Sequence, residues 1–272
     1  MYLKNLLYEK TGGTMAETKQ LYGTVLIKAD QILTYLTEKD TPQTLNQIAK
    51  GAGLTNPTTL KILDTLTAIG YVRKDEETKK FKLGPSLIRY ANRAMDQYDI
   101  KDLAQPYLKQ LQAETGETVH LGIKNGSHIV YIDKLESNKP ICLYSQIGKN
   151  LPLYCSAMGK AMLAEQMDSE IETYISETEL TRFTQYTITE KQPFMEEINR
   201  IRKLGYAFDN REHEEEVFCI GMSLSLNGKN FGAFSVSIPY YRVNEPVLQN
   251  ALSSMNKCRQ NLLADLDAAF PF

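Results

Sequence analysis

Residues 44–84 combine, in order, a short amphipathic segment, a glycine turn, a capped second segment and a lysine-rich hairpin. The first segment repeats apolar side chains at intervals of three and four, which is typical of a helix, and it ends at Gly51. The second starts where Asn56 can accept from free N–H groups and Pro57 has no N–H to lose, and it stops at Gly70. Two helices and a hairpin in this order predict a winged helix-turn-helix.

The second of these helices has two unlike sides. At 100° per residue, one side collects residues that we expect to be buried, namely Ile62, Leu63, Leu66 and Ile69, with Thr59 beside them. The other side is too polar for a core and suits a DNA groove. Because recognition helices usually touch bases near their start, the predicted contact residues are Asn56, Pro57, Thr58, Thr59, Leu60 and Lys61. Of these, Thr58 and Lys61 suit base edges or phosphates and Leu60 suits a thymine methyl, and the spacing leaves the choice open.

The hairpin after Gly70 is predicted to form a wing, with strands over residues 71–74 and 79–83 around a polar tip. Its positive charge would grip phosphates and supply salt-dependent affinity without choosing a sequence. The basic residues assigned to this role are Arg73, Lys74, Lys79 and Lys80. The simpler alternative is a small helical domain whose lysines only keep it soluble.

Length and charge indicate a second domain. The chain has 272 residues, too many for one winged helix. Its net charge is only −2, yet residues 20–93 carry eleven Lys/Arg against seven Asp/Glu, and residues 94–272 carry seventeen against twenty-four. The basic end should therefore contact DNA. We expect a flexible leader over residues 1–20, a winged helix-turn-helix over 21–85, a linker helix over 86–100 and a second domain over 101–272.

Several functional classes are disfavoured by what the chain lacks. It contains no run of about 18 apolar residues, so no membrane partner is expected, and residues 1–16 do not have the pattern of a secretory signal. His120 and His128 flank a predicted hairpin, where a surface or half-buried role is expected rather than a metal site. No zinc site, disulfide framework or cofactor is expected, and a reducing cytoplasm fits, because no C-x-x-C pair occurs among Cys142, Cys155, Cys219 and Cys258.

The second half alternates predicted helices with strand pairs. Helices are expected over residues 87–99, 100–116, 159–166, 194–204 and 245–268, and strands over 118–123, 128–135, 141–147, 217–226 and 231–238. Asn125-Gly126 and Asn227-Gly228 are dipeptides that tolerate the positive φ angles of two-residue hairpin turns. This order predicts an α+β fold, an antiparallel sheet covered by helices, with room for a small molecule between them.

The order of motifs resembles a known family. After the winged helix come "ETGETVHLGIKNGSHIVYIDKLES", "GKNLPLYCSAMGKAML", "GYAFDNREHEEEVFCIGMSL" and "GAFSVSIP". Together they resemble the isocitrate lyase regulator (IclR) family of bacterial transcription regulators, over residues 21–270. The resemblance implies a GAF-like effector-binding domain whose pocket takes small organic acids or related metabolites. Carried over residue by residue, it implies that the polar pocket residues are Asp209, Cys219, Ser235 and Ser237.

The predicted pocket residues suit an anionic effector. Ser235 and Ser237 lie two apart on one strand, so both hydroxyls can donate to one carboxylate. The amides of Ser156, Ala157, Met158 and Gly159, at a helix start, would add donors. Asp209 repels a carboxylate, so we expect it to accept from a hydroxyl or a hydrated carbonyl of the ligand. Simpler roles are a turn residue for Asp209, a small buried residue for Cys219 and a solvent face for the serines.

The sequence therefore predicts a cytoplasmic, ligand-responsive transcription regulator without enzymatic activity. It would bind a roughly palindromic double-stranded DNA operator as a homo-oligomer, a dimer or tetramer paired through the linker helices. Three alternatives stay open: a redox-responsive regulator acting through its cysteines, an enzyme with Cys155 or Cys219 as nucleophile, and an architectural DNA-binding protein without a ligand.

Overall fold

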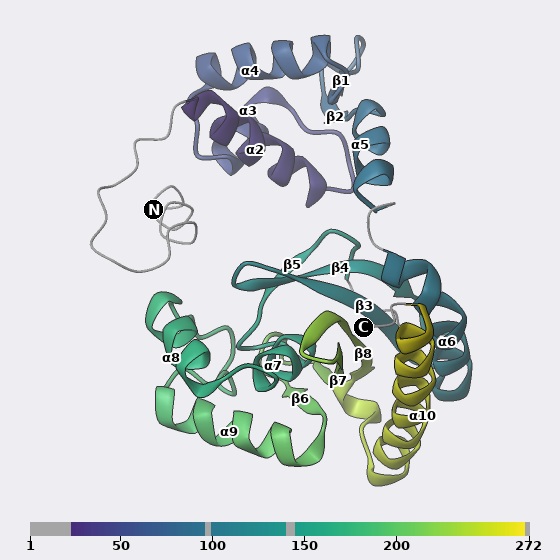
Figure 1. Ribbon diagram of the computed structural model, residues 1–272. Helices are drawn as coiled ribbons and strands as arrows, with labels where there is room; N and C mark the ends of the chain where they lie inside the picture. Colours follow the sequence, from purple (N-terminus) through teal and green to yellow (C-terminus); the bar gives the residue numbers. More distant parts are fainter. Residues whose placement is uncertain (1–22, 96–98, 140–144, 270–272) are drawn as a thin grey trace. The chain divides into compact units, whose positions relative to one another are not determined.

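The computed structural model describes residues 23–95, 99–139 and 145–269 (Figure 1). The chain divides into two compact units between residues 98 and 99, and each is described by itself. Within the described residues, no helix is both long enough and apolar enough to cross a membrane.

The N-terminal unit is a winged helix-turn-helix, as predicted. Its elements are α2 (Thr24–Thr37), α3 (Leu45–Gly51), α4 (Asn56–Ala68), β1 (Val72–Lys74), β2 (Phe81–Leu83) and α5 (Ser86–Met95). The strands β1 and β2 pair as an antiparallel hairpin, the wing. Helices α2, α3 and α4 pack against one another around a core that includes Ile32, Leu36, Ile48, Leu63, Leu66, Val72 and Phe81.

Three local features of this unit differ from the sequence predictions. The pattern did not identify α2, which supplies Ile32 and Leu36 to the core. Asn56 does not cap α4, because Thr55 precedes the helix and the Asn56 side chain donates instead to Asn46 Oδ1 of α3 at 2.6 Å. Ile69 is 49 % exposed, because it follows the last residue of α4 and turns away with the chain.

The C-terminal unit is an α+β domain built on one six-stranded antiparallel sheet in the order β5-β4-β3-β8-β7-β6. Its strands are β3 (Thr118–Asn125), β4 (His128–Leu135), β5 (Asn150–Pro152), β6 (Ala207–Asn210), β7 (Val217–Leu226) and β8 (Lys229–Pro239). Its helices are α6 (Asp99–Thr115), α7 (Ala157–Ala164), α8 (Asp168–Glu177), α9 (Lys191–Leu204), the 3₁₀ turn η1 (Tyr240–Arg242) and α10 (Glu245–Ala269).

Helices cover both faces of this sheet. The pair α6 and α10 packs on one face, and α7 packs on the other with α8 and α9 beside it (Figure 1). Alternation along the central strands separates the two faces, because successive side chains of a strand point to opposite sides. On β8, Phe234, Val236 and Ile238 are buried on the side of α6 and α10, whereas Ser235 and Ser237 point to the side of α7.

Most predicted elements of this unit are confirmed. Both hairpins form. Asn227-Gly228 is the turn of the second, with φ angles of 50° and 78°, whereas the turn of the first is Gly126-Ser127, because Asn125 still pairs with His128 within the sheet. The predicted strand over residues 141–147 lies mostly outside the described residues, and residues 145–147 are not a strand. Four elements were not identified from the sequence, namely β5, β6, α8 and η1, because each is short or lacks a clear apolar period.

Candidate functional site

The helix-turn-helix is fixed by local hydrogen bonds. Thr44 and Gln47 form a capping box at the start of α3: Thr44 Oγ1 accepts from the Gln47 amide at 3.4 Å, and Gln47 Oε1 accepts from the Thr44 amide at 2.9 Å. The Leu54 amide donates to Ala49 O at 2.8 Å and closes the turn. Because α4 then buries its apolar side against α2 and α3, its polar side is left on the surface.

The start of α4 presents most of the predicted DNA-contacting residues. Asn56, Pro57, Leu60 and Lys61 are exposed, and Thr58 is half-buried. Thr59 was wrongly included among the contacts. Its side chain is 0 % exposed and its hydroxyl donates to Thr55 O at 2.9 Å, so it cannot reach a base.

The wing carries its charge at the surface. Arg73, Lys79 and Lys80 are exposed, and Lys74 is half-buried with its ammonium 5.7 Å from the centre of the Phe81 ring. Lys79 Nζ lies 3.1 Å from Glu76, but both side chains are largely exposed, so this ion pair is weak and Lys79 stays available to a phosphate.

The C-terminal unit contains a cavity between the sheet and the N-terminus of α7, with a volume of about 40 Å³. A single water occupies about 10–15 Å³ on the same scale, so the cavity suits a compact molecule. It gathers residues that are far apart in the sequence. Seven of the eight predicted effector residues line it: Ser156, Ala157, Met158, Asp209, Cys219, Ser235 and Ser237.

The eighth predicted residue, Gly159, does not line the cavity. Its amide donates to Ser156 Oγ at 3.2 Å, which caps α7, so this N–H is not free for a ligand. A Cβ at Gly159 would lie 2.4 Å from both Cα and O of Leu153, so the glycine serves close packing. The prediction of a ligand donor at Gly159 is therefore wrong.

A glycine on the sheet brings the start of α7 to the cavity. A Cβ at Gly221 of β7 would lie 2.4 Å from the Ala157 carbonyl carbon and 2.5 Å from the Met158 nitrogen. The first turn of α7 therefore lies directly on the backbone of β7. The start of a helix carries free N–H groups and partial positive charge, which favour an anion. Ala157 and Met158, both in this turn, line the cavity.

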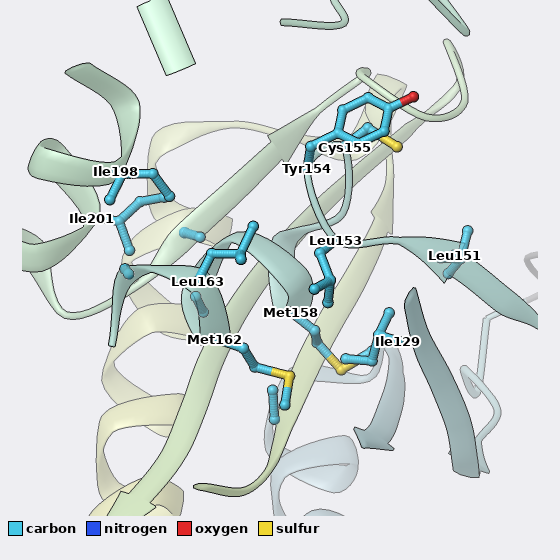
Figure 2. Close-up of a cluster of buried hydrophobic side chains, with 14 of the residues drawn as sticks. Ile129, Leu151, Leu153, Tyr154, Cys155, Met158, Met162, Leu163, Ile198 and Ile201 are labelled. Atoms are coloured by element: carbon cyan, nitrogen blue, oxygen red, sulfur yellow. The ribbon is translucent and has the colours of Figure 1, made fainter. Parts of the chain in front are cut away.

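The flank of α7 is anchored in a large apolar cluster. Met158, Met162 and Leu163 of α7 contact a cluster that includes Ile198 and Ile201 of α9 (Figure 2). Ile129 of β4 and Leu151 of β5 belong to the same cluster. This packing fixes α7 against both the sheet and α9.

Strand register places the polar side chains in two neighbouring rows. Asp209 of β6 pairs with Cys219 of β7, and Cys219 pairs with Ser237 of β8. In the next row, Ser235 of β8 pairs with His120 of β3. The four strands thus deliver one carboxyl, one thiol, two hydroxyls and one imidazole to the same wall.

A hydrogen-bonded chain runs through these rows. His120 Nε2 lies 2.7 Å from Ser145 Oγ and His120 Nδ1 lies 3.3 Å from Ser237 Oγ, which in turn lies 3.1 Å from Cys219 Sγ. His120 also stacks on Tyr131, with ring centres 4.5 Å apart. Burial, together with the charges of two nearby lysines, lowers the pKa of His120 to about 3, so its imidazole is neutral at pH 7. The prediction of a surface or half-buried His120 was wrong, because the side chain is 1 % exposed.

Asp209 is the buried carboxyl of the cavity wall. It is 5 % exposed, and its Oδ1 accepts from the Glu212 amide at 2.7 Å and the His213 amide at 3.4 Å. Burial raises the pKa of Asp209 to about 7, and the nearby Glu212 carboxyl adds to the rise. Desolvation disfavours the charged form more than the two amides and Lys160 favour it.

The nearby ammonium groups already have carboxyl partners. Lys160 of α7 is 0 % exposed, bonds to Glu212 and lies 3.4 Å from Glu197. Lys149 Nζ, at the cavity, lies 3.4 Å from Glu214 Oε1. Asp209 itself has no salt bridge with a cation in the part of the chain that the structure describes.

The thiols are unfavourable as nucleophiles. Burial raises the pKa of Cys219 well above its usual value and likewise raises that of Cys155. Burial also raises the pKa of Cys258 to about 12. The thiolate is the reactive form, so these cysteines lack the activation that an enzyme or a thiolate-based redox sensor requires. Cys142 lies outside the described residues.

Sequence reasoning missed part of the cavity lining, namely His120, Tyr131, Ser145, Lys149, Leu151, His213, Glu214 and Val217. The strand positions contained a usable signal. His120 lies two residues from Thr118 on one strand, in the middle of a predicted sheet, where a polar side chain needs a partner. The loop residues Lys149, His213 and Glu214 carried no comparable pattern.

Comparison with known proteins decides the family. Residues 25–76 match the IclR helix-turn-helix domain, and residues 92–263 match the bacterial transcriptional regulator IclR C-terminal domain. The chain belongs to the IclR family of bacterial transcriptional regulators. It is similar to the HTH-type transcriptional regulator XynR of Escherichia coli, with 32 % identity over 224 residues, 82 % of this chain and 89 % of XynR.

Other relatives agree with this assignment. The IclR protein of Thermotoga maritima has a similar structure, with a TM-score of 0.72 and 29 % identity over 90 % of this chain and 99 % of that one. An IclR homologue of Microbacterium hydrocarbonoxydans complexed with 4-hydroxybenzoate shares the fold, with a TM-score of 0.71 at 20 % identity, over 88 % of this chain and 99 % of that one. The protein is thus an IclR-family transcription regulator with a DNA-binding helix-turn-helix, and its relatives are regulators rather than enzymes.

Proposed function

We propose that this IclR-family regulator binds operator DNA through α4 and the wing, and that a small organic acid in the cavity changes its affinity for DNA. The observation that carries the effector part is the convergence of seven predicted residues on one cavity at the N-terminus of α7. The structurally similar Microbacterium protein, complexed with 4-hydroxybenzoate, adds support for an acid as effector.

The DNA part rests on the surface of α4. The N-terminal part of α4 has exposed side chains on the side opposite the core, namely Asn56, Pro57, Leu60 and Lys61. Recognition helices contact base edges in the major groove with this N-terminal part. The exposed Arg73, Lys79 and Lys80 of the wing would hold phosphates beside it. Selection of duplexes from a random library by the full chain, followed by fluorescence anisotropy at several salt concentrations, tests this part.

We also propose that the regulator acts as a homo-oligomer paired through α5. Ile88 and Tyr90 of this helix are 60 % and 48 % exposed in the single chain. Two reading heads would double the DNA surface that one small module buries. Sedimentation equilibrium of the wild-type chain and of Ile88→Glu measures the assembly, and a wild-type monomer at micromolar concentration would contradict it.

The effector part is tested by thermal stabilisation. A ligand that binds the native state raises the melting temperature. The panel consists of pyruvate, gluconate and 4-hydroxybenzoate, each beside a neutral counterpart: methyl pyruvate, glucose and 4-hydroxybenzamide. We expect an acid to stabilise the wild-type chain and the double variant Ser235→Ala/Ser237→Ala to lose that stabilisation.

A matched control separates the cavity from the loss of any two hydroxyls. Ser169 and Ser253 are exposed on α8 and α10, so Ser169→Ala/Ser253→Ala should keep the ligand response. Equal stabilisation of the cavity variant and the control would place the effector site elsewhere. The acid should also change the dissociation constant of the selected duplex, since otherwise it is not an effector.

A further inference from the structure

The cavity wall has an unusual charge balance. Asp209 lines the cavity as a carboxyl without an ion-pair partner in the described chain. Lys160 of α7 acts on Asp209 through its charge, but its ammonium is already bound by Glu212 and Glu197. Lys149 is the one lysine among the described lining residues, and it pairs with Glu214. An anionic ligand therefore meets no unengaged ammonium beside Asp209.

Among the described residues, the hydrogen bonds to Asp209 all end on one of its two oxygens. Oδ1 is occupied by the amides of Glu212 and His213. Those bonds orient the carboxyl, while the residue lines the cavity next to the first turn of α7. A carboxylate placed against that turn would satisfy the free N–H groups of the helix start. It would then stand beside Asp209, where two ionised carboxyl groups repel each other strongly in a buried site.

We propose that the effector of this regulator is a carboxylate that binds together with one proton, the proton residing between the ligand carboxylate and Asp209. In this bound state Asp209 is the hydrogen-bond donor, and the proton comes from the solvent. The inference rests on the proposed function, because it assumes that the effector occupies this cavity. It replaces the expectation that Asp209 accepts from a ligand hydroxyl.

The titratable neighbours support this assignment. The titratable groups that act on Asp209 or line the same cavity are Glu212, His213 and Glu214 of the following loop, Lys160 of α7, Cys155 before α7, Cys219 of β7, Tyr131 of β4, His120 of β3 and Lys149. Glu212 adds to the burial of Asp209 in raising its pKa to about 7, and Lys160 opposes the rise. A proton is therefore available to Asp209 near neutral pH, and an arriving carboxylate raises that occupancy further.

The first experiment measures proton uptake directly. Titration calorimetry of the wild-type chain with pyruvate, gluconate and 4-hydroxybenzoate is run at pH 7 in buffers of different ionisation enthalpy. We expect the acid that binds to take up about half a proton, because a group with a pKa of about 7 is half protonated beforehand. The dissociation constant should rise about tenfold from pH 6 to pH 8. The ligands themselves stay ionised throughout this range.

Two variants assign the proton. Asp209→Asn keeps an oxygen for the Glu212 and His213 amides and offers an N–H to the ligand, so its affinity should be independent of pH between 6 and 8. His213→Gln removes the neighbouring imidazole of the cavity lining but keeps the backbone amide that donates to Asp209, and it should keep the tenfold slope. A slope that disappears in His213→Gln and persists in Asp209→Asn would overturn the proposal.

A ligand-free measurement keeps the test independent of the variants. The ¹³C carboxyl resonance of Asp209 in the full chain should titrate near pH 7, and a midpoint near pH 4 would overturn the proposal. Acids that bind without proton uptake, or a panel in which only the neutral compounds bind, would also overturn it and leave small-molecule regulation intact. A panel in which no compound binds would overturn both this inference and the proposed effector function.

Discussion

The two candidate surfaces of this regulator use polar residues in opposite ways. On α4 and the wing, the side chains assigned to DNA are mostly exposed and make few bonds to the protein. Around the cavity, the polar side chains are mostly buried and hydrogen-bonded to one another. The comparison teaches that substitutions at the DNA surface should change binding alone, whereas substitutions at or behind the cavity should change the stability of the fold as well.

The largest effect is expected at Lys160, behind the cavity. Its ammonium is fully buried between Glu212 and Glu197, so Lys160→Met leaves the buried Glu212 carboxyl without its cation, whereas Glu197 keeps Arg200. Removal of one partner of a buried pair costs about 3–5 kcal/mol. Urea unfolding of the full chain measures this loss in the C-terminal unit.

The exposed pair of Lys191 and Glu172 is the matched control, and Lys191→Met should cost less than about 1 kcal/mol. The double variant Lys160→Met/Glu212→Gln should regain part of the lost stability. An equal loss of unfolding free energy in Lys160→Met and Lys191→Met would contradict the difference that we expect between buried and exposed ion pairs.

Asp209 should make the stability of the C-terminal unit depend on pH. Its folded-state pKa of about 7 lies above the ordinary value of 3.8, so its stabilising contribution is complete below about pH 3.8 and is lost as the pH rises through about 7. Between pH 5 and pH 8 this loss amounts to about 3 kcal/mol. The free energy of unfolding is measured for Asp209→Asn and for the wild type at pH 5 and at pH 8. The difference between the two proteins should shift in favour of the variant at pH 8. A constant difference would contradict the raised pKa.

Lys61 tests the exposed DNA surface, where a substitution should change binding but not stability. Lys61→Ala should weaken binding of the selected duplex by about 1–3 kcal/mol if the ammonium contacts a base edge, with no change in the urea unfolding curve. Lys39, exposed at the end of α2, provides a control of equal charge, and Lys39→Ala should have a smaller effect on affinity. A loss of stability in Lys61→Ala would show that the two surfaces do not differ in the manner described.

The smallest and most uniform effect is expected at the wing. Lys79→Ala/Lys80→Ala should weaken binding to every duplex alike and reduce the slope of log affinity against log salt by about 2, because two phosphate contacts disappear. Anisotropy titrations at several salt concentrations measure that slope. Lys109→Ala/Lys124→Ala, two exposed lysines of the C-terminal unit, remove the same charge and should leave the slope unchanged.

Local periodicity carried most of the fold prediction. The hairpin dipeptides and the long amphipathic helices repeat a pattern within a few residues, and these elements are confirmed. The strand β6 has four residues and no period long enough to recognise, yet it carries Asp209. It pairs with β7, the next strand along the chain, but the loop between them contains no Asn-Gly dipeptide that would mark a hairpin.

The candidate site was predictable where a motif specified a residue and unpredictable where packing did. The family resemblance supplied Asp209, Cys219 and the two serines, and all line the cavity. It did not reveal that His120 is buried between two serines, because that arrangement depends on strand register and on Ser145 from a distant loop. Thr59 was misassigned because a position beside the apolar stripe of a helix becomes fully covered once α2 and α3 pack there.

The contact between Gly221 and the first turn of α7 limits how this protein can be re-engineered. Any side chain introduced at that position would lie against the main chain of Ala157 and Met158 and would lift the helix from the sheet. A sensor for bulkier metabolites should therefore be evolved by shortening buried lining side chains such as Tyr131 or Leu151, while codon 221 is held fixed in the mutant library.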